Sequence, residues 1–188
     1  MDHPFYLAKR SMAIAASLFI LAIFTAASAI AQDQAGIPAA AAACGPSSVP
    51  YQTKLDNSQH AVAQPEPGKS LVYVIQDMGV VSCLGACITT RVGLDGAWVG
   101  ANEHNSYFSF SVDPGEHHLC ANRQSHFPIL SQMIALAHFT AEAGKTYYFR
   151  TRTTSSRDQA YLDFDAIDSD QGRFYVAIYP LSVSHAKK

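Results

Sequence analysis

The feature that most constrains this chain is a pair of tight turns that lie close together between residues 93 and 119. The first, Asp95-Gly96, suits a two-residue hairpin turn, because both of its central residues need a positive φ angle. The second, Asp113-Pro114-Gly115-Glu116, suits a type II turn, in which proline sets φ at the second position and glycine accepts a positive φ at the third. Three strand-like runs joined by two such turns predict a small antiparallel β domain rather than an active site.

The segments around these turns have the periodicity of strands. Leu71–Ile75 is apolar at every position, which predicts a central strand with both faces buried. Tyr107–Val112 alternates, so Phe108, Phe110 and Val112 are predicted to face the core. Further strands are predicted at 88–94, 97–100, 116–121, 136–141, 146–152, 161–167 and 174–181, and a long loop or one short helix at 122–132. Eight or nine short strands predict an all-β fold, either a small antiparallel β-sandwich or a flattened barrel.

Two hairpins are predicted in the second half of the chain. The strand at 136–141 is expected to pair with 146–152 across residues 142–145. The strand at 146–152 is then expected to pair with 161–167, with arginines opposite aspartates on the solvent face. A slip of one residue would turn the arginines toward the core, so this register is predicted to be strongly held. The predicted opposite residues are Arg152 and Asp163, Thr151 and Phe164, Arg150 and Asp165, and Phe149 and Ala166.

Three motifs together resemble a known family. They are the Leu94-Asp95-Gly96 turn with the aromatic strand and Pro-Gly-Glu-His turn that follow it, the strand of Pro67–Val74, and the Gly-Lys-Thr-Tyr-Tyr strand within Ala143–Arg150. This pattern resembles the DUF2846 family of bacterial exported proteins and, more loosely, PEGA-type surface β domains. The resemblance spans roughly residues 65–181 and consists of turn and packing motifs. It implies a β fold and no established activity; many members of the family look like lipoproteins.

The N-terminus is typical of a secretory signal peptide. Lys9 and Arg10 precede an almost wholly apolar run over residues 11–29, and Ala29-Ile30-Ala31 has the small residues that a signal peptidase requires. We expect cleavage before Gln32 and export to the periplasm or the medium, with no stable membrane insertion afterwards. The alternative is a retained membrane anchor, because the run approaches the ~20 apolar residues that span a bilayer. The predicted organisation is a signal peptide at 1–31, an Ala/Pro-rich spacer at 32–69, a β-sandwich domain at 70–183 and a tail at 184–188.

The four cysteines all follow the predicted signal peptide. An even number in an exported chain indicates two disulfides. Cys44 with Cys83, and Cys87 with Cys120, is the favoured pairing, because a Cys83–Cys87 bond would close only a tiny loop. Lipidation of Cys44 is a lesser alternative, since Cys44 lies far beyond the apolar run. Zinc bound by Cys83, Cys87, Cys120 and a histidine of the His117-His118 pair is another, which we disfavour because thiols oxidise readily outside the cytoplasm.

Charge and composition exclude some functions and support few. The formal net charge is −2 at pH 7 and no basic stripe is present, which argues against sequence-independent nucleic-acid binding. No Gly-x-Ser-x-Gly elbow accompanies the serines and histidines. Asp163, Asp165, Asp168 and Asp170 are possible calcium ligands by type, but their alternation and the following turn fit a solvated strand face better. We therefore predict no metal and no cofactor.

The function predicted from sequence is broad. We expect an exported, non-catalytic β-sandwich module with a structural, adaptor or binding role at the bacterial envelope, in contact with an envelope protein or a glycan. Trp98 and Tyr148 are candidate surface contacts, although aromatic residues also fill the cores of small sandwiches. The alternative is a periplasmic protein that binds a small ligand or a metal through the loops at 77–87 and 122–132. An enzyme is the least favoured class.

Overall fold

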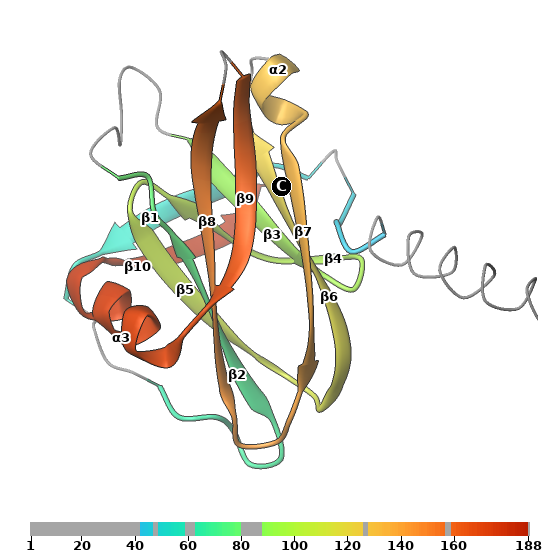
Figure 1. Cartoon of the computed structure of the whole chain (residues 1–188), viewed down its shortest axis with the longest axis vertical. Coiled ribbons are helices and arrows are strands. Elements are labelled where there is room, and N and C mark those ends of the chain that lie inside the picture. The colour runs from blue at the N-terminus through green and yellow to red at the C-terminus, as the bar shows by residue number, and fades with distance from the viewer. Residues whose placement is uncertain are drawn as a thin grey trace, which may run out of the picture. The chain divides into compact units, whose positions relative to one another are not determined.

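The computed structural model describes residues 42–46, 49–58, 63–79, 88–125, 128–156 and 159–187. In these residues the chain forms ten strands and two helices (Figure 1). The predicted signal peptide and its cleavage site lie outside them, as do Cys83 and Cys87. The elements are β1 (Tyr51–Asp56), β2 (Ser70–Gln76), β3 (Thr89–Leu94), β4 (Ala97–Glu103), β5 (Ser106–Val112), β6 (Gly115–Gln124), α2 (Pro128–Ser131), β7 (Ile134–Ala141), β8 (Thr146–Ser156), β9 (Gln159–Ile167), α3 (Ser169–Ile178) and β10 (Leu181–Ala186).

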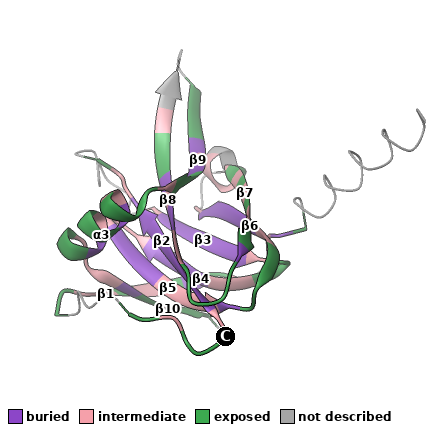
Figure 2. Cartoon of the chain, turned by 60° about the horizontal axis from the view of Figure 1, so that its bottom comes forward, coloured by how far each residue is buried: buried purple, intermediate pink, exposed green. Residues whose placement is uncertain are grey.

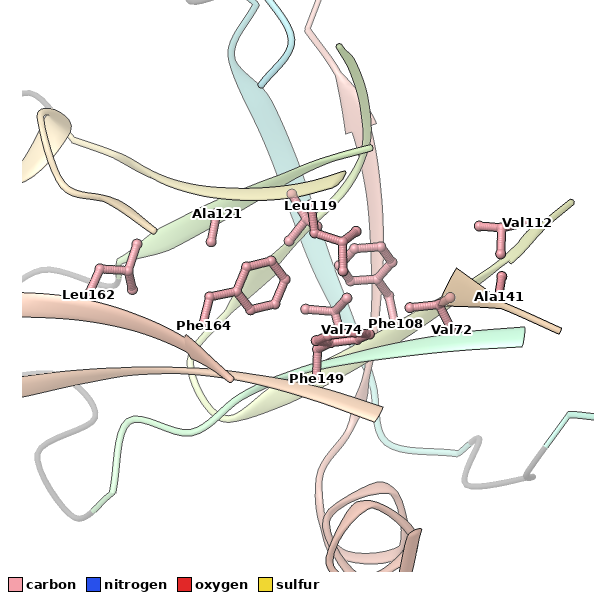
Figure 3. Packing of buried hydrophobic residues seen from close by; sticks show 11 residues of the cluster. Val72, Val74, Phe108, Val112, Leu119, Ala121, Ala141, Phe149, Leu162 and Phe164 are labelled. Atoms are coloured by element: carbon pink, nitrogen blue, oxygen red, sulfur yellow. The ribbon is translucent and has the colours of Figure 1, made fainter. Parts of the chain in front are cut away.

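The strands form two sheets. Sheet A has the order β1-β10-β5-β2-β8-β9 and sheet B the order β4-β3-β6-β7. Most neighbours are antiparallel, but β2 and β8 pair in parallel, as do β10 and β5. The sheets pack around one apolar core (Figure 3). This confirms the predicted all-β sandwich, and no closed barrel forms in the described residues. The buried core residues are Val72, Val74, Val92, Phe108, Val112, Leu119, Ala121, Ala141, Phe149, Leu162 and Phe164.

Strand β2 is central and buried on both faces, as its continuous apolar run predicts (Figure 2). Its Val72 and Val74 face sheet B. Its other face contributes to a second apolar cluster on the outer side of sheet A, which α3 covers. The strand therefore carries buried side chains on both sides. The second cluster consists of Leu71, Tyr73, Ile75, Tyr107, Tyr148 and Val176.

The two predicted turns have the expected glycine conformations. Asp95 and Gly96 have φ angles of 49° and 92°, and β3 and β4 form the hairpin around them. Gly115 has a φ of 144°, in the range that favours glycine. The second turn, however, leads from β5 in sheet A to β6 in sheet B, so it is a corner between sheets rather than a hairpin. Residues 142–145 are also a corner, because β7 pairs with β6 and β8 pairs with β2, and the predicted pairing of 136–141 with 146–152 is wrong.

The β8–β9 register is the predicted one in every pair. Phe149 lies opposite Ala166, Arg150 opposite Asp165, Thr151 opposite Phe164, and Arg152 opposite Asp163. Arg152 forms the expected ion pair with Asp163, with Nε 3.9 Å from Oδ2. Arg150 is half-buried instead of fully exposed, because α3 lies over this face; its Nη1 donates to the hydroxyl of Tyr175 at 3.3 Å.

Residues 169–178 form helix α3, so the strand predicted at 174–181 is wrong. Asp168 is the N-cap, and its Oδ1 accepts hydrogen bonds from the backbone N–H groups of Asp170 and Gln171, each at 2.9 Å. Aspartate at this position stabilises a helix start by roughly 1 kcal/mol. Gly172 and Val176, four residues apart, face the sheet, and Gly172 leaves no room for a Cβ against the ring of Tyr148. The turn that the sequence predicts after the strand with Asp163 and Asp165 is therefore the start of this helix.

The sheets extend beyond the predicted domain limits of 70 and 183. Strand β1, inside the predicted 32–69 spacer, pairs with β10 along all six residues, and β10 continues to Ala186. Strand β6 also runs to Gln124, three residues into the predicted 122–132 loop, and only α2 matches the short helix expected there. The described part of the spacer thus completes one edge of sheet A.

Cys44 is bonded to Cys120, which corrects the predicted pairing of Cys44 with Cys83 and Cys87 with Cys120. The two Cα atoms are 5.1 Å apart and 76 residues apart in sequence. Residues 42–46, which we call the strap, lie on the outer face of sheet B. There, Ala43 is fully buried and its carbonyl accepts a hydrogen bond from Gly96 N–H at 3.1 Å. A Cβ on Gly93 would lie 2.5 Å from that carbonyl, so the strap requires glycine beneath it.

Candidate functional site

The apolar interior of the sandwich becomes polar at one end. Along β2 the inward row Val72, Val74 ends at Gln76, and along β6 the row Leu119, Ala121 ends at Arg123. The inward row of β8 changes in the same way, because Phe149 is followed by the buried Thr151 and then by the exposed Thr153. On β3, Val92 is preceded by the buried Thr90. Gln76, Thr90, Arg123 and Thr151 are each at most 1% exposed. A buried polar end on an otherwise apolar core is the region where a ligand would find hydrogen-bonding groups.

Arg123 is the largest side chain among the fully buried ones in the described residues. Its Nη2 donates to Oγ1 of Thr153 on the opposite sheet, and the two Nη atoms lie 4.0 and 3.9 Å from Sδ of Met78. No described carboxylate forms an ion pair with it. Burial lowers the pKa of its guanidinium from 12.5 to about 10, so the group is still charged at neutral pH. The protein therefore keeps a positive charge in its interior without an acidic partner in the described residues.

Three buried atoms on these inward rows lack hydrogen-bond partners among the described residues. They are Nε of Arg123, Oε1 of Gln76 and Oγ1 of Thr90. Thr90 lies directly across from Arg123 in the β3–β6 register, and Gln76 is held in place because its Nε2 donates to the carbonyl of Ile88 at 3.0 Å. Unsatisfied buried polar atoms each destabilise a fold by about 1–3 kcal/mol. We call Arg123, Gln76 and Thr90, with the contacts Met78 and Thr153, the Arg123 site.

The Arg123 site joins parts of the two ranges that the sequence indicates for ligand binding. Met78 comes from the 77–87 range and Arg123 from the 122–132 range, and residues 80–87 lie outside the described residues. Sequence reasoning missed Arg123 as an inward residue because it ended the strand at Ala121. The alternation of Leu119, Ala121 and Arg123 is the signal that places the arginine inside.

The two candidate surface aromatics are differently placed. Tyr148 is 5% exposed and stacks on Tyr73 with ring centroids 5.1 Å apart, so it is a core residue and its prediction as a surface contact is wrong. It is buried because α3 covers the face that was expected to be in solvent. Trp98 is partly covered: its Nε1 donates to the carbonyl of Pro46 at 2.8 Å and the guanidinium of Arg91 lies 4.5 Å from its ring. The tryptophan thus holds the strap in place.

The residues considered as metal ligands are dispersed or already engaged. Cys120 is bonded to Cys44, which removes it from a zinc site and removes Cys44 from lipidation. Asp163 accepts from Thr154 Oγ1 at 2.9 Å, Asp168 caps α3, and Asp170 pairs with Arg173 at 2.5 Å. In the described residues no three His, Cys, Asp or Glu side chains are grouped closely enough to hold a metal ion. The same residues include no helix long and apolar enough to cross a membrane.

A family model matches residues 66–163, under the description "Protein of unknown function (DUF2846)". The chain belongs to the DUF2846 family. The match runs from just before β2 into β9 and contains Gln76, Thr90 and Arg123, but not β1, α3 or β10. No curated protein and no solved structure matches the chain.

Within the DUF2846 region, His117 and Asp95 form a second polar pair. Nδ1 of His117 is 2.6 Å from Oδ2 of Asp95, and Nε2 is 2.8 Å from the carbonyl of Asp113. Burial lowers the pKa of His117, but the two hydrogen bonds and the nearby negative charges outweigh it and raise the pKa above 6.5. Burial raises the pKa of Asp95, but the backbone N–H of His118 and the side chain of His117 lower it below 3.8 on balance. Both ring nitrogens face acceptors, which favours imidazolium.

This pair predicts a pH-dependent stability that Asp95→Asn removes. The His117 contribution is present below pH 6.5 and is lost as the pH rises through its raised pKa. The Asp95 contribution is present above pH 3.8 and is lost as the pH falls through its lowered pKa. Asn-Gly favours the same hairpin turn as Asp95-Gly96, so the variant changes the charge and leaves the backbone conformation unchanged. We expect the difference in unfolding free energy between wild type and variant to be largest at about pH 4–6.5. Urea titrations from pH 4 to 9 measure this, and a difference independent of pH would contradict it.

Proposed function

We propose that this chain is an exported, non-catalytic binding module of the bacterial envelope, and that Arg123 binds an anionic group of its ligand. The observation that carries this proposal is the buried guanidinium of Arg123, which has no carboxylate partner in the described residues and an unbonded Nε. An anion placed against Nε would neutralise the charge and complete its hydrogen bonds. Arginine suits this role because its planar fork bonds carboxylate and phosphate oxygens two at a time.

A purely structural role for Arg123 is the competing explanation, and energetics argue against it. Taking a charged group out of water costs several kcal/mol, and a hydroxyl and a thioether return only part of that. Even complete buried ion pairs are often no more stable than apolar residues of similar size. Arg123 has no such ion pair among the described residues and still occupies the interior. The buried guanidinium therefore destabilises the free protein, and a bound anion would raise the stability of the folded state.

The exported location in this proposal rests on the predicted signal peptide and on the Cys44–Cys120 bond. Structural disulfides persist mainly in oxidising compartments such as the periplasm and the medium. Metal binding, which the sequence left open, is not part of the proposal, because a buried guanidinium repels a cation. An adaptor role through protein contacts remains compatible with it, since the anionic group can belong to a protein.

The test is the stability of Arg123→Met, which keeps the length of the side chain and removes its charge. We expect the variant to be more stable than wild type by about 1–4 kcal/mol in the absence of ligand, as for other buried charges replaced by apolar groups. Sodium acetate, with ionic strength matched by sodium chloride, is expected to stabilise wild type in a concentration-dependent way and to leave the variant unchanged. Equilibrium unfolding in urea measures both.

The matched control is Arg152→Met, which removes an arginine that is exposed and paired on the neighbouring hairpin. It is expected to change stability by less than about 1 kcal/mol and to keep the acetate effect. A destabilised Arg123→Met together with an acetate effect equal in all three proteins would show that Arg123 is structural and would overturn the proposal.

A further inference from the structure

Two strand edges that no described strand pairs with lie beside Arg123. Strand β7 is the last strand of sheet B and β9 the last of sheet A, and they run side by side in the same direction (Figure 1). Arg123 contacts a residue close to each edge. Its backbone N–H donates to the carbonyl of Met133, just before the edge strand β7. Its guanidinium donates to Thr153 of β8, which lies opposite Leu162 of the edge strand β9. The buried charge therefore lies just inside the line where the two edges meet, which we call the seam.

Strand β7 has backbone hydrogen-bonding groups on the edge that faces away from β6. The hydrogen bond from Arg123 N–H to Met133 O sets the ladder, so Ala135, Ala137 and Phe139 bond to β6 while the backbone groups of the even-numbered residues point outward. No described strand pairs with this edge. Natural edge strands are usually protected by charge, proline or a bulge. The sequence Ile-Ala-Leu-Ala-His-Phe-Thr-Ala has no charged residue and no proline, and its pairing with β6 is regular.

We propose, building on the function proposed above, that the ligand of the Arg123 site is the free C-terminus of an extended peptide, which adds to β7 as an extra strand. The terminal carboxylate meets Arg123, and the peptide backbone bonds the outward groups of β7. Because Arg123 lies at the N-terminal end of β7, the peptide runs antiparallel to that strand. Ile134 and Leu136, which are 54% and 43% exposed, lie along this edge and are available to apolar side chains of the peptide.

Charge favours a carboxylate over phosphate at this site. The site has one cation, and a carboxylate carries one negative charge, so binding leaves a neutral pair in the interior. A phosphate dianion would leave an excess negative charge there, which is costly in a low-dielectric environment.

The test uses one peptide in two forms, acetyl-Ala-Val-Ala-Val-Ala with a free carboxylate and the same peptide with a C-terminal amide. Binding to the exported protein is measured by calorimetry and by backbone amide NMR. We expect the free acid to bind at least tenfold more tightly than the amide, and Arg123→Met to abolish this preference. We expect the amide resonances of β7 to shift on binding.

Substitutions at Leu136 separate strand addition from simple carboxylate binding. Leu136→Pro removes one outward N–H that bonds no described strand, so we expect the fold to be kept and the affinity to fall at least tenfold. Leu136→Ala loses the same apolar contact but keeps the N–H, so its affinity is expected to fall by less than that of Leu136→Pro. The spectrum of the free Leu136→Pro variant verifies its fold.

Each other outcome rejects one part of the account. Equal affinity of acid and amide, tighter binding of inorganic phosphate than of the acid, or equal affinity of the proline and alanine variants would overturn the peptide proposal. If acetate still stabilises wild type through Arg123 in those cases, the proposed anion site stands without the peptide. If neither acetate nor either peptide binds, both proposals are overturned.

Discussion

Phe149→Ala is expected to lower the free energy of unfolding by roughly 3–5 kcal/mol, the range for loss of a buried phenylalanine. Phe149 is 2% exposed and lies on β8 between Val74 of β2 and Ala166 of β9. Its ring centroid is 5.8 Å from that of Phe164 on the same sheet (Figure 3). It is also 5.1 Å from that of Phe139 on sheet B, so Phe149 bridges the two sheets. Its loss would leave a cavity that neither sheet can close alone.

Urea unfolding measures this effect, with two controls. Phe149→Leu keeps most of the volume and is expected to destabilise by much less than the alanine variant. Arg152→Ala removes an exposed ion pair on the same strand and is expected to change stability by less than about 1 kcal/mol. A loss of under 1 kcal/mol for Phe149→Ala would mean that β8 does not face the core as described.

Removal of the Cys44–Cys120 disulfide, as Cys44→Ala with Cys120→Ala, is expected to destabilise the protein by about 2–5 kcal/mol. The bond joins residues 76 positions apart in sequence. A disulfide that closes a long loop removes more conformational entropy from the unfolded chain than one that closes a short loop. It also holds the strap against the outer face of sheet B. Alanine suits both positions because Cys120 is fully buried and a serine hydroxyl there would need a partner.

Trp98 is the only tryptophan of the chain and lies against Pro46 and Gly45, so its fluorescence reports the strap directly. In the double variant its emission is expected to shift to the red and to become more accessible to acrylamide. Mapping of non-reduced peptides by mass spectrometry should recover Cys44 linked to Cys120. Recovery of Cys44 linked to Cys83 would contradict the structure, and an unchanged stability would show that the strap is held without the bond.

Patterns that act over a few residues predicted the structure well. The Asp95-Gly96 hairpin, the double burial of β2 and the β8–β9 register all follow from local alternation and turn chemistry, which a single sequence displays. The assignment of β7 and β8 to different sheets does not follow from them, because a four-residue connection fits both a hairpin and a corner. Sheet membership depends on distant partners that no local pattern specifies.

The errors at the ends of the chain have a related cause. Strand β1 is short and polar, and it is stable because β10 pairs with it from 125 (Asp56↔Leu181) to 135 (Tyr51↔Ala186) residues away in sequence. Helix α3 carries tyrosines and small residues that also suit a strand, and the cap at Asp168 with the close packing of Gly172 on Tyr148 decides in favour of the helix. Cys44 reaches Cys120 because the strap crosses sheet B, a path set by tertiary packing.

The candidate site was predictable only in part. The two loop ranges that the sequence indicates do meet, at Met78 and Arg123. The buried charge was missed because the predicted strand ended at Ala121 and Arg123 fell in the predicted 122–132 loop, although it continues the inward row of Leu119 and Ala121. Burial of Arg123 without an acid is a property of the packed sheets, and it becomes visible only when the opposite sheet is in place.

The central claim is that Arg123 is a buried cation kept for an anion, and the NMR signal of its Nε–H tests this most directly. In wild type, titration with sodium acetate at constant ionic strength is expected to shift that signal saturably, because the free Nε–H gains an acceptor. The Nε–H of the exposed Arg152 serves as the internal reference and is expected to stay unchanged. A constant Arg123 signal, or parallel small shifts of all arginine signals, would contradict the account.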